Sequence, residues 1–157
     1  MQNKKNKFVP FVLFVIGTEL VGYISSLLSG DISQKYAQLN KPPFSPAGQL
    51  FGIVWPILYA GMGIAVAIVY NQNTIESKQA LKWYFMQLSV NFFWSILFFG
   101  LTLHWVALLV LVILDILVGY LLAIYFKINK LSFWLTLPYL IWILFATYLN
   151  LGIALLK

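Results

Sequence analysis

The chain has no cysteine and no arginine, and it contains few charged residues of any kind. Of its 157 residues, 9% are charged and 62% are hydrophobic, whereas soluble domains average about 25% charged residues. The lack of cysteine excludes disulfides, thiolate metal sites and cysteine nucleophiles. The net charge of +6 comes from ten lysines, but no soluble domain is predicted that would hold a nucleic acid. The composition therefore indicates an integral membrane protein.

Five apolar runs are long enough to cross the hydrocarbon core, which takes roughly 20 residues per helix. The sequence predicts a single all-α membrane domain over residues 1–157, a bundle of five transmembrane helices. We expect the first span to be retained, because it is long, contains Glu19 and lacks a signal-peptide cleavage site. Ser45 and Pro46 fit an N-cap followed by Pro in the first helical turn. The predicted spans are Phe8–Leu28, Pro46–Tyr70, Ala80–Leu101, Trp105–Phe126 and Leu131–Leu156, with residues 29–45 as a lid loop.

The distribution of lysines predicts the orientation in the membrane. Seven lysines fall on the N-terminal side of the predicted spans and three on the opposite side. Because cytoplasmic loops carry the excess of basic residues, we expect the N-terminus in the cytoplasm, and the lid loop and C-terminus outside. The seven are Lys4, Lys5, Lys7, Lys78, Lys82, Lys127 and Lys130.

The segment QLSVNFFWS, residues 87–95, places polar side chains inside an apolar run. If it is helical, Gln87, Asn91 and Trp94 lie on one face. At about 1.5 Å per residue, Trp94 falls in the outer half of its span, as does Trp55, while Trp142 is central. These deep aromatic residues either line a cavity or pack helices together. For Gln87 we favour a bond to a neighbouring helix, and Asn91 fits either interpretation. The pattern predicts a pocket beneath the lid.

Two acidic residues, Glu19 and Asp115, lie within predicted spans without a lysine at matching depth. A partnerless acid in the membrane is favoured in its neutral form. Each therefore fits a proton-coupled site or, more simply, a protonated acid bonded to an amide or carbonyl. His104, the only histidine, is a poor candidate for haem ligation. The GxxxG match at residues 48–52 is a weak indication of close helix approach or of a dimer contact.

Three segments together resemble one family: KPPFSPAGQLFGIVWPILYAGMG (41–63), QLSVNFFWSILFFG (87–100) and PYLIWILFATYLNLGI (138–153). They are similar to the translocator protein and tryptophan-rich sensory protein family, also called peripheral benzodiazepine receptors. The resemblance implies a bacterial member with five helices, commonly a homodimer in the cell membrane. It also implies a pocket under the lid loop that binds porphyrins, haem-like tetrapyrroles and isoquinoline-carboxamide drugs.

Carried over position by position, the resemblance implies a ligand site on four of the five spans. Trp105 and Leu108 are possible additions at the outer end of the fourth span. The resemblance also implies that a larger side chain at Ala146 should crowd the pocket. The chain departs from the family at Phe44, where a Trp is frequent. Tyr148 has no Lys or Arg within about five residues, so the cholesterol motif fails and cholesterol is not an expected ligand. The implied residues are Phe51, Trp55, Tyr59, Asn91, Trp94, Trp105, Leu108, Trp142, Phe145, Ala146 and Leu149.

Three functions are compatible with these residues. The first is a receptor for tetrapyrroles such as protoporphyrin IX, which needs no cofactor or metal, with Lys35 and Lys41 attracting the propionates. The second is light- and oxygen-dependent degradation of the porphyrin, with Trp94 and Trp142 as redox participants and no conventional catalytic set. The third is a proton-coupled transporter of small molecules that uses Glu19.

Overall fold

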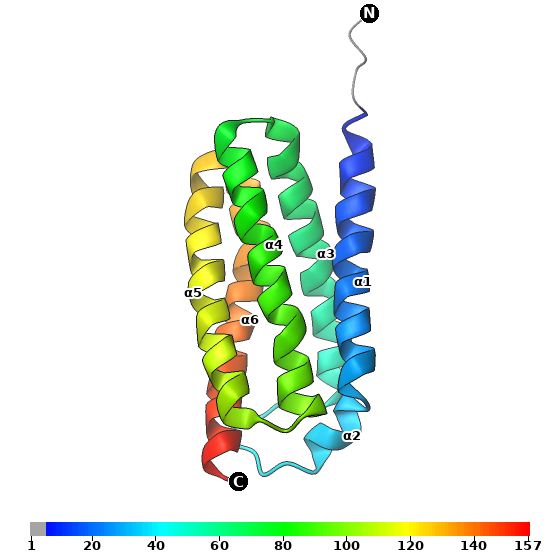
Figure 1. The fold of residues 1–157 in the computed structure, drawn as a ribbon, viewed down its shortest axis with the longest axis vertical. Coiled ribbons are helices and arrows are strands. Elements are labelled where there is room, and N and C mark those ends of the chain that lie inside the picture. The colour runs from blue at the N-terminus through cyan, green and yellow to red at the C-terminus, as the bar shows by residue number, and fades with distance from the viewer. Residues whose placement is uncertain (1–5) are drawn as a thin grey trace, which may run out of the picture.

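The computed structural model describes residues 6–157, which form long helices lying side by side and one short helix across their end (Figure 1). The helices alternate in direction, so the lid segment between α1 and α3 lies at the same end of the bundle as the C-terminus. The elements are α1 (Phe8–Ser29), α2 (Ile32–Ala37), α3 (Gln49–Gln72), α4 (Ile75–Ser95), the π-helical turn η1 (Ile96–Gly100), α5 (His104–Ile128) and α6 (Lys130–Leu155).

Short polar residues set several helix ends. The side chain of Thr74 accepts a hydrogen bond from Ser77 N at 3.1 Å and begins α4. Asn129 accepts from Leu131 N and Ser132 N at 2.9 and 3.2 Å and begins α6. Asn73, with a φ of 52°, ends α3 in the left-handed conformation, which Asn tolerates better than most residues. These caps satisfy backbone groups that a helix end leaves unpaired.

The long helices form a ring. Helix α1 packs against α3, α3 against α6, α6 against α5, and α5 against α4, while α4 returns to α1. The side chains that α1 buries are all small: Thr18, Gly22, Ser25 and Ser29. Helix α1 can therefore approach its neighbours closely, but it contributes little bulk to the interior.

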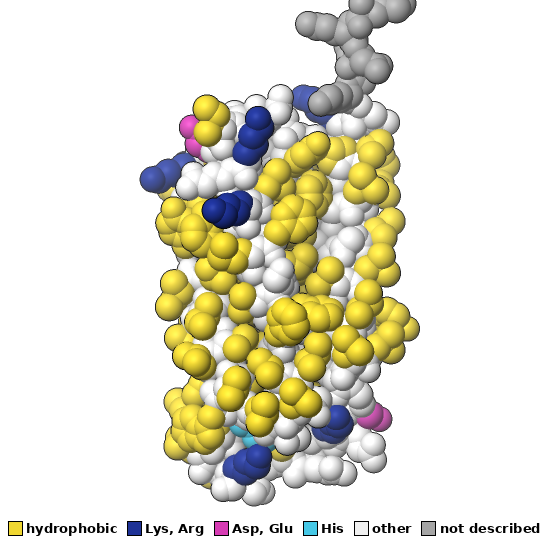
Figure 2. Space-filling model, in the orientation of Figure 1, with side chains coloured by type: hydrophobic (Ala, Val, Ile, Leu, Met, Phe, Trp, Pro, Cys, Tyr) yellow, Lys and Arg dark blue, Asp and Glu magenta, His cyan; other side chains and the backbone are white. Residues whose placement is uncertain are grey.

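Within residues 6–157, four helices are long and apolar enough to cross a membrane: α1, α3, α5 and α6. Helix α4 is not among them: its first two turns, IESKQALK, are polar, and Gln87, Ser89 and Asn91 interrupt the apolar run that follows. On the face shown in Figure 2, hydrophobic side chains cover the middle of the molecule, whereas lysine and acidic side chains gather toward its two ends. The all-helical fold is confirmed, and the fifth membrane span stays a prediction.

Two local predictions were wrong. Helix α3 begins at Gln49 rather than Pro46, and Gly48 is its N-cap. The hydroxyl of Ser45 donates instead to Pro42 O at 2.6 Å, so it closes a turn within the lid and caps no helix. The lid, predicted as a loop over residues 29–45, contains helix α2, whose N-cap Asp31 accepts from Gln34 N at 3.0 Å.

The lysines predicted for the N-terminal side do lie at one end of the bundle, because α4 and α6 begin there and α5 ends there. Lys4 and Lys5 lie outside the described residues. Lys35, Lys41 and Lys157 lie at the lid end. Which end faces the cytoplasm stays a prediction.

Candidate ligand pocket

A cavity of about 430 Å³ lies between α1, α3 and α4, directly beneath α2. Its volume is in the range of small-molecule sites, about 300–1,000 Å³. Five of the predicted site residues line it: Phe51, Trp55, Tyr59, Asn91 and Trp94. The remaining lining residues are Glu19, Gly22, Tyr23, Ser25, Ser26, Ile32, Ser33, Gly48, Gln49, Gly52, Pro56, Ser95 and Phe99.

One wall of the cavity is aromatic. Trp55 stacks on Tyr59 with ring centroids 5.4 Å apart, and the rings of Trp55 and Trp94 lie 6.0 Å apart. Tyr59 reaches this position because Gly22 has no side chain, since a Cβ at position 22 would lie 2.6 Å from Tyr59 Cδ2. Flat rings in this arrangement present π faces on which another flat ring can stack.

Buried hydrogen bonds fix the floor of the cavity. The hydroxyl of Tyr59 donates to Asn91 Oδ1 at 2.8 Å, and Asn91 Nδ2 donates to the Tyr139 hydroxyl at 2.7 Å. Tyr139 donates in turn to Gln87 Oε1 at 3.0 Å. Gln87 therefore joins helices, as predicted, whereas Asn91 both joins helices and lines the cavity. The chain of bonds connects α3, α4 and α6, so the orientation of the Tyr59 ring depends on all three helices.

Trp94 is held from its far side by α6. Its Nε1 donates to Asn150 Oδ1 at 3.2 Å, and Asn150 Nδ2 donates to His104 O at 2.8 Å. His104 itself is buried against Phe98, with ring centroids 4.7 Å apart. It does not line the cavity. The structure thus fixes Trp94 through a residue, Asn150, that sequence reasoning missed.

The predicted site residues of α6 lie apart from this cavity. Ala146 and Leu149 line a separate gap of only about 10 Å³, next to Tyr36 of the lid. Trp142 packs against Phe51 with ring centroids 6.0 Å apart, and Phe145 packs behind Trp142 at 5.9 Å. Within residues 6–157, the buried Nε1 of Trp142 has no hydrogen-bond partner.

Tyr36 of the lid borders the smaller of the two spaces and does not line the cavity. Its side chain is 3% exposed and meets Phe51 edge-on, with ring centroids 4.8 Å apart. Phe51 and Trp94 line both the cavity and the small gap. The lid thus inserts an aromatic ring between α3 and α6, where the resemblance implies ligand. No pattern in the sequence predicts that a lid residue enters the bundle.

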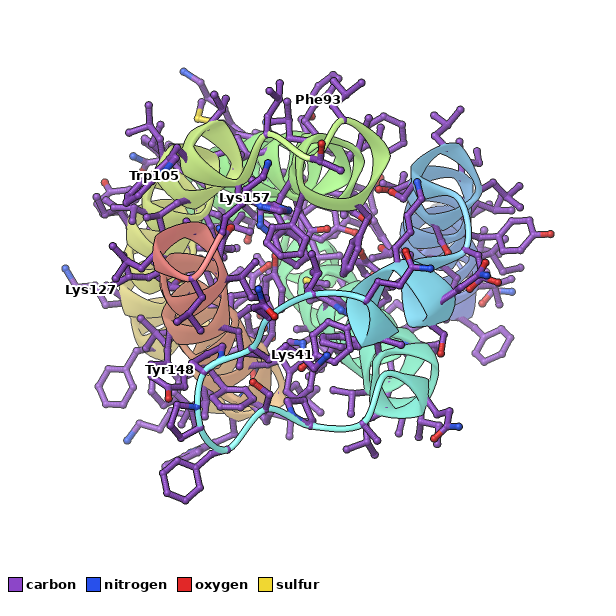
Figure 3. All side chains as sticks on the ribbon, turned by 90° about the horizontal axis from the view of Figure 1, so that it is seen from below. Lys41, Phe93, Trp105, Lys127, Tyr148 and Lys157 are labelled. Atoms are coloured by element: carbon purple, nitrogen blue, oxygen red, sulfur yellow. The ribbon has the colours of Figure 1, made fainter. Side chains whose placement is uncertain are left out.

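Trp105 and Leu108, the additions on α5, lie away from the cavity. Trp105 is 58% exposed and points outward from the bundle (Figure 3). Leu108 is half-buried on the same helix. Trp134 near the start of α6 is 61% exposed, which fits the predicted position at a membrane interface.

Both lid lysines are bound to backbone carbonyls. Lys35 Nζ donates to Ser29 O and Phe99 O, each at 2.9 Å, and so joins the ends of α1 and η1. Lys41 Nζ donates to Tyr36 O at 3.0 Å and to Leu39 O at 2.9 Å. Neither ammonium lines the cavity. Lys35 and Lys41, whose charge was predicted to attract propionates, therefore hold the lid in place through these backbone bonds.

The two membrane acids have different surroundings. Asp115 Oδ2 accepts a hydrogen bond from Thr147 Oγ1 at 2.7 Å, which joins α5 to α6. Glu19 lines the cavity together with Tyr23 and Ser26, one and two helical turns nearer the lid. Since α1 and α5 are not neighbours in the ring, the two carboxyls do not form a pair. Asp115 is bonded to a hydroxyl rather than to an amide or carbonyl, and Glu19 belongs to the candidate site.

Comparison with known proteins adds a decisive match: the TspO/MBR family model covers residues 9–156. The chain belongs to the TspO/MBR family. The tryptophan-rich protein TspO of Archaeoglobus fulgidus is 38% identical over 96% of this chain and 97% of its own length. The tryptophan-rich sensory protein of Cereibacter sphaeroides is 32% identical over 89% of this chain and 86% of its own. The human translocator protein is 29% identical over 91% and 87%.

Membership of the TspO/MBR family agrees with the apolar helices. Together they identify an integral membrane protein. The family predicted from three sequence segments is therefore confirmed over nearly the whole chain.

Proposed function

We propose that this TspO/MBR protein is a membrane receptor that binds flat aromatic ligands, tetrapyrroles first among them, in the cavity under α2. The observation that carries the proposal is the aromatic wall of Trp55, Tyr59 and Trp94 beside a space of about 430 Å³. A planar macrocycle would stack on these rings and exclude water from them. Protoporphyrin IX is the expected ligand, and isoquinoline-carboxamide drugs would compete for the same rings.

We further propose that α4, continued by η1, is the fifth membrane span. Its polar first turns would then lie at the interface of a bacterial cell membrane, on the cytoplasmic side with the N-terminus. The polar side chains at its centre support this, because Gln87 and Asn91 are bonded inside the bundle and need no water. The protein would act as a homodimer, as the resemblance implies.

The residues of α6 would join the site only when the lid ring moves. Trp142 has an unpaired indole N–H among the described residues, and Ala146 borders the gap beside Tyr36. Displacement of Tyr36 would connect this gap with the cavity across Phe51. A large ligand such as a porphyrin would then contact α3, α4 and α6 together.

The test is a titration of the purified protein with protoporphyrin IX in the dark, followed by tryptophan fluorescence. Saturable quenching at one equivalent per chain is the expected result. A linear decrease without saturation, equal to that of free tryptophan, would rule out the receptor function.

Degradation of bound porphyrin under light and oxygen is a second candidate. The contiguous rings of Trp55, Tyr59 and Trp94 favour it, because oxidisable side chains would surround an excited pigment. We expect new absorbance bands under illumination in air with the wild-type protein. Equal porphyrin loss with and without the protein would exclude this activity.

Proton-coupled transport is a third candidate, and it depends on Glu19. Tyr23, Ser26, Ser33 and Gln49 line the same cavity between this carboxyl and the lid end, which would supply hydrogen-bonding groups for a water path. Uptake of an aromatic cation into liposomes driven by a pH gradient, and abolished in Glu19→Gln, would establish transport. Uptake that is equal in wild type and Glu19→Gln would exclude it.

A further inference from the structure

Several residues that line the cavity are also exposed on the side of the molecule. Tyr23 on α1 is 62% exposed, and Ser26 on α1 and Gly52 and Pro56 on α3 are exposed as well. The cavity therefore opens sideways between α1 and α3. Tyr23 lies six residues before the end of α1, and Pro56 lies seven residues after the start of α3, so this opening reaches about 10 Å along the helices. Both helices are apolar enough to cross a membrane, so in a bilayer this opening would face lipid.

The lid closes the end of the bundle much more firmly. Besides the carbonyl bonds of Lys35 and Lys41, Tyr148 on α6 donates to Pro43 O at 2.8 Å, and Figure 3 shows the lid crossing beside Tyr148. Pro42 fits against Gly152 so closely that a Cβ at position 152 would lie 2.5 Å from Pro42 Cγ. Passage through the lid would break these contacts and withdraw Tyr36. Passage between α1 and α3 breaks none of them.

Gly52 stands in this opening without a side chain. In the described part of the chain, no heavy atom beyond its own neighbours and helix backbone lies within 4 Å of a Cβ built on it. The glycine is therefore not required for close packing within the chain. Its lack of a side chain leaves the opening wide.

We propose that the opening between α1 and α3 is a lateral entrance through which membrane-dissolved, flat hydrophobic ligands reach the cavity from the bilayer. The inference rests on the proposed receptor function, because it concerns the same cavity. The lateral entrance limits the ligands to molecules that partition into lipid. The passage lies between Tyr23 on α1 and Gly52 on α3. The lid then covers the bundle end during entry, and the displacement of Tyr36 that a porphyrin needs in order to reach α6 follows entry.

The first test compares Gly52→Phe with Gly119→Phe in lipid nanodiscs, using protoporphyrin IX and stopped-flow tryptophan quenching. Gly119 on α5 is the matched control, because a Cβ at that position also has no neighbour within 4 Å in residues 6–157. A narrowed passage slows entry and exit alike, so Gly52→Phe should lower both the association and dissociation rates at least tenfold. Association within threefold of the control, or slower association without slower dissociation, would overturn the entrance.

The second test fastens the lid with a disulfide. The chain has no cysteine of its own, and a Cβ at Gly48 would lie 3.1 Å from Ser33 Oγ, a spacing that suits a bond between α2 and the start of α3. In the Ser33→Cys, Gly48→Cys double variant, the oxidised and reduced forms should associate with protoporphyrin IX at the same rate. Tenfold slower association on oxidation, reversed by reductant, would show that the lid is the route.

The wild-type titration distinguishes failure of the receptor function from failure of the lateral entrance. If wild-type protein shows no saturable binding, the receptor function fails. If wild type binds and Gly52→Phe has the kinetics of Gly119→Phe, the receptor function stands and only the lateral entrance fails.

Discussion

The two sides of α3 differ in how they are filled. On the side of α1 and α4, small residues such as Gly22 and Ser25 leave a cavity of about 430 Å³. On the side of α6, Ala146 and Leu149 border a gap of about 10 Å³, because Tyr36 from the lid occupies the space. The aromatic residues Phe51 and Trp94 face both sides. Aromatic residues therefore border both spaces, and the cavity forms only where the neighbouring helix presents small side chains.

The largest expected effect comes from separating α1 and α3 at the other end of their contact. A Cβ at Gly63 would lie 2.6 Å from Val15 Cα and 3.0 Å from Phe14 O, so backbone must move to accept a side chain. We expect Gly63→Leu to destabilise the protein by about 3 kcal/mol. Because α1 and α3 would move apart, the cavity between α1, α3 and α4 would also be lost. Denaturation in mixed micelles measures the loss. Gly119→Leu is the control, and equal stability of the two variants would show that this crossing is not needed.

A smaller effect is expected from removing one ring of the aromatic wall. Trp55→Ala should raise the Kd for protoporphyrin IX at least tenfold, about 1.4 kcal/mol, because a stacking face is lost. Trp142→Ala should raise it less, since Trp142 does not line the open cavity. Trp134→Ala, at an exposed position on α6, should leave the Kd unchanged in the same fluorescence titration. Equal losses for Trp55→Ala and Trp134→Ala would show that the cavity is not the binding site.

A third prediction concerns the residue that fills the α6 side. Burial raises the pKa of Tyr36 above its ordinary value of 10.0, and among the described residues its buried hydroxyl has no hydrogen-bond partner. The neutral phenol is therefore favoured in the folded lid. Its contribution to stability is complete below pH 10 and is lost as the pH rises through the higher folded-state value. The thermal midpoint of the wild type should fall more steeply between pH 9 and about 11 than that of Tyr36→Phe. Parallel curves would mean that Tyr36 does not anchor the lid.

The smallest effect is expected far from the cavity. Thr147→Val removes the hydrogen bond from Thr147 to Asp115, and bonds of this kind between membrane helices are worth about 0.6 kcal/mol. Stability should fall by that amount, while the Kd for protoporphyrin IX stays unchanged. A change in Kd would indicate that the packed α5 and α6 side is coupled to the cavity.

The sequence predicted the long helices, and five of the eleven predicted site residues line the cavity. Hydrophobic run lengths located the long helices to within a few residues, because a span must match the thickness of the bilayer. The depth of Trp55, Tyr59, Asn91 and Trp94 placed them together, and all four line the cavity. The start of α3 was wrong, because Ser45 bonds within the lid rather than to a helix.

The remaining residues depended on contacts that no local pattern records. Asn150 matters because its amide bonds Trp94 and the start of α5, and these partners are far apart in the sequence. Gly22 matters because Tyr59 from another helix lies against it. Glu19, Tyr23 and Ser26 were visible as polar residues at the right depth, but only the rotation of α1 in the ring turned them toward the cavity.

By itself, the sequence determined that this is an all-helical membrane protein of the TspO/MBR family, because apolar run lengths and linked motifs are properties of the chain. Only the tertiary structure decided where the empty space lies. Small residues on α1 leave a cavity between α1, α3 and α4, and the ring of Tyr36 fills the space toward α6. The physical reason is that side-chain volumes from several helices share one interior, and which of them meet depends on the rotation of each helix and on the path of the lid.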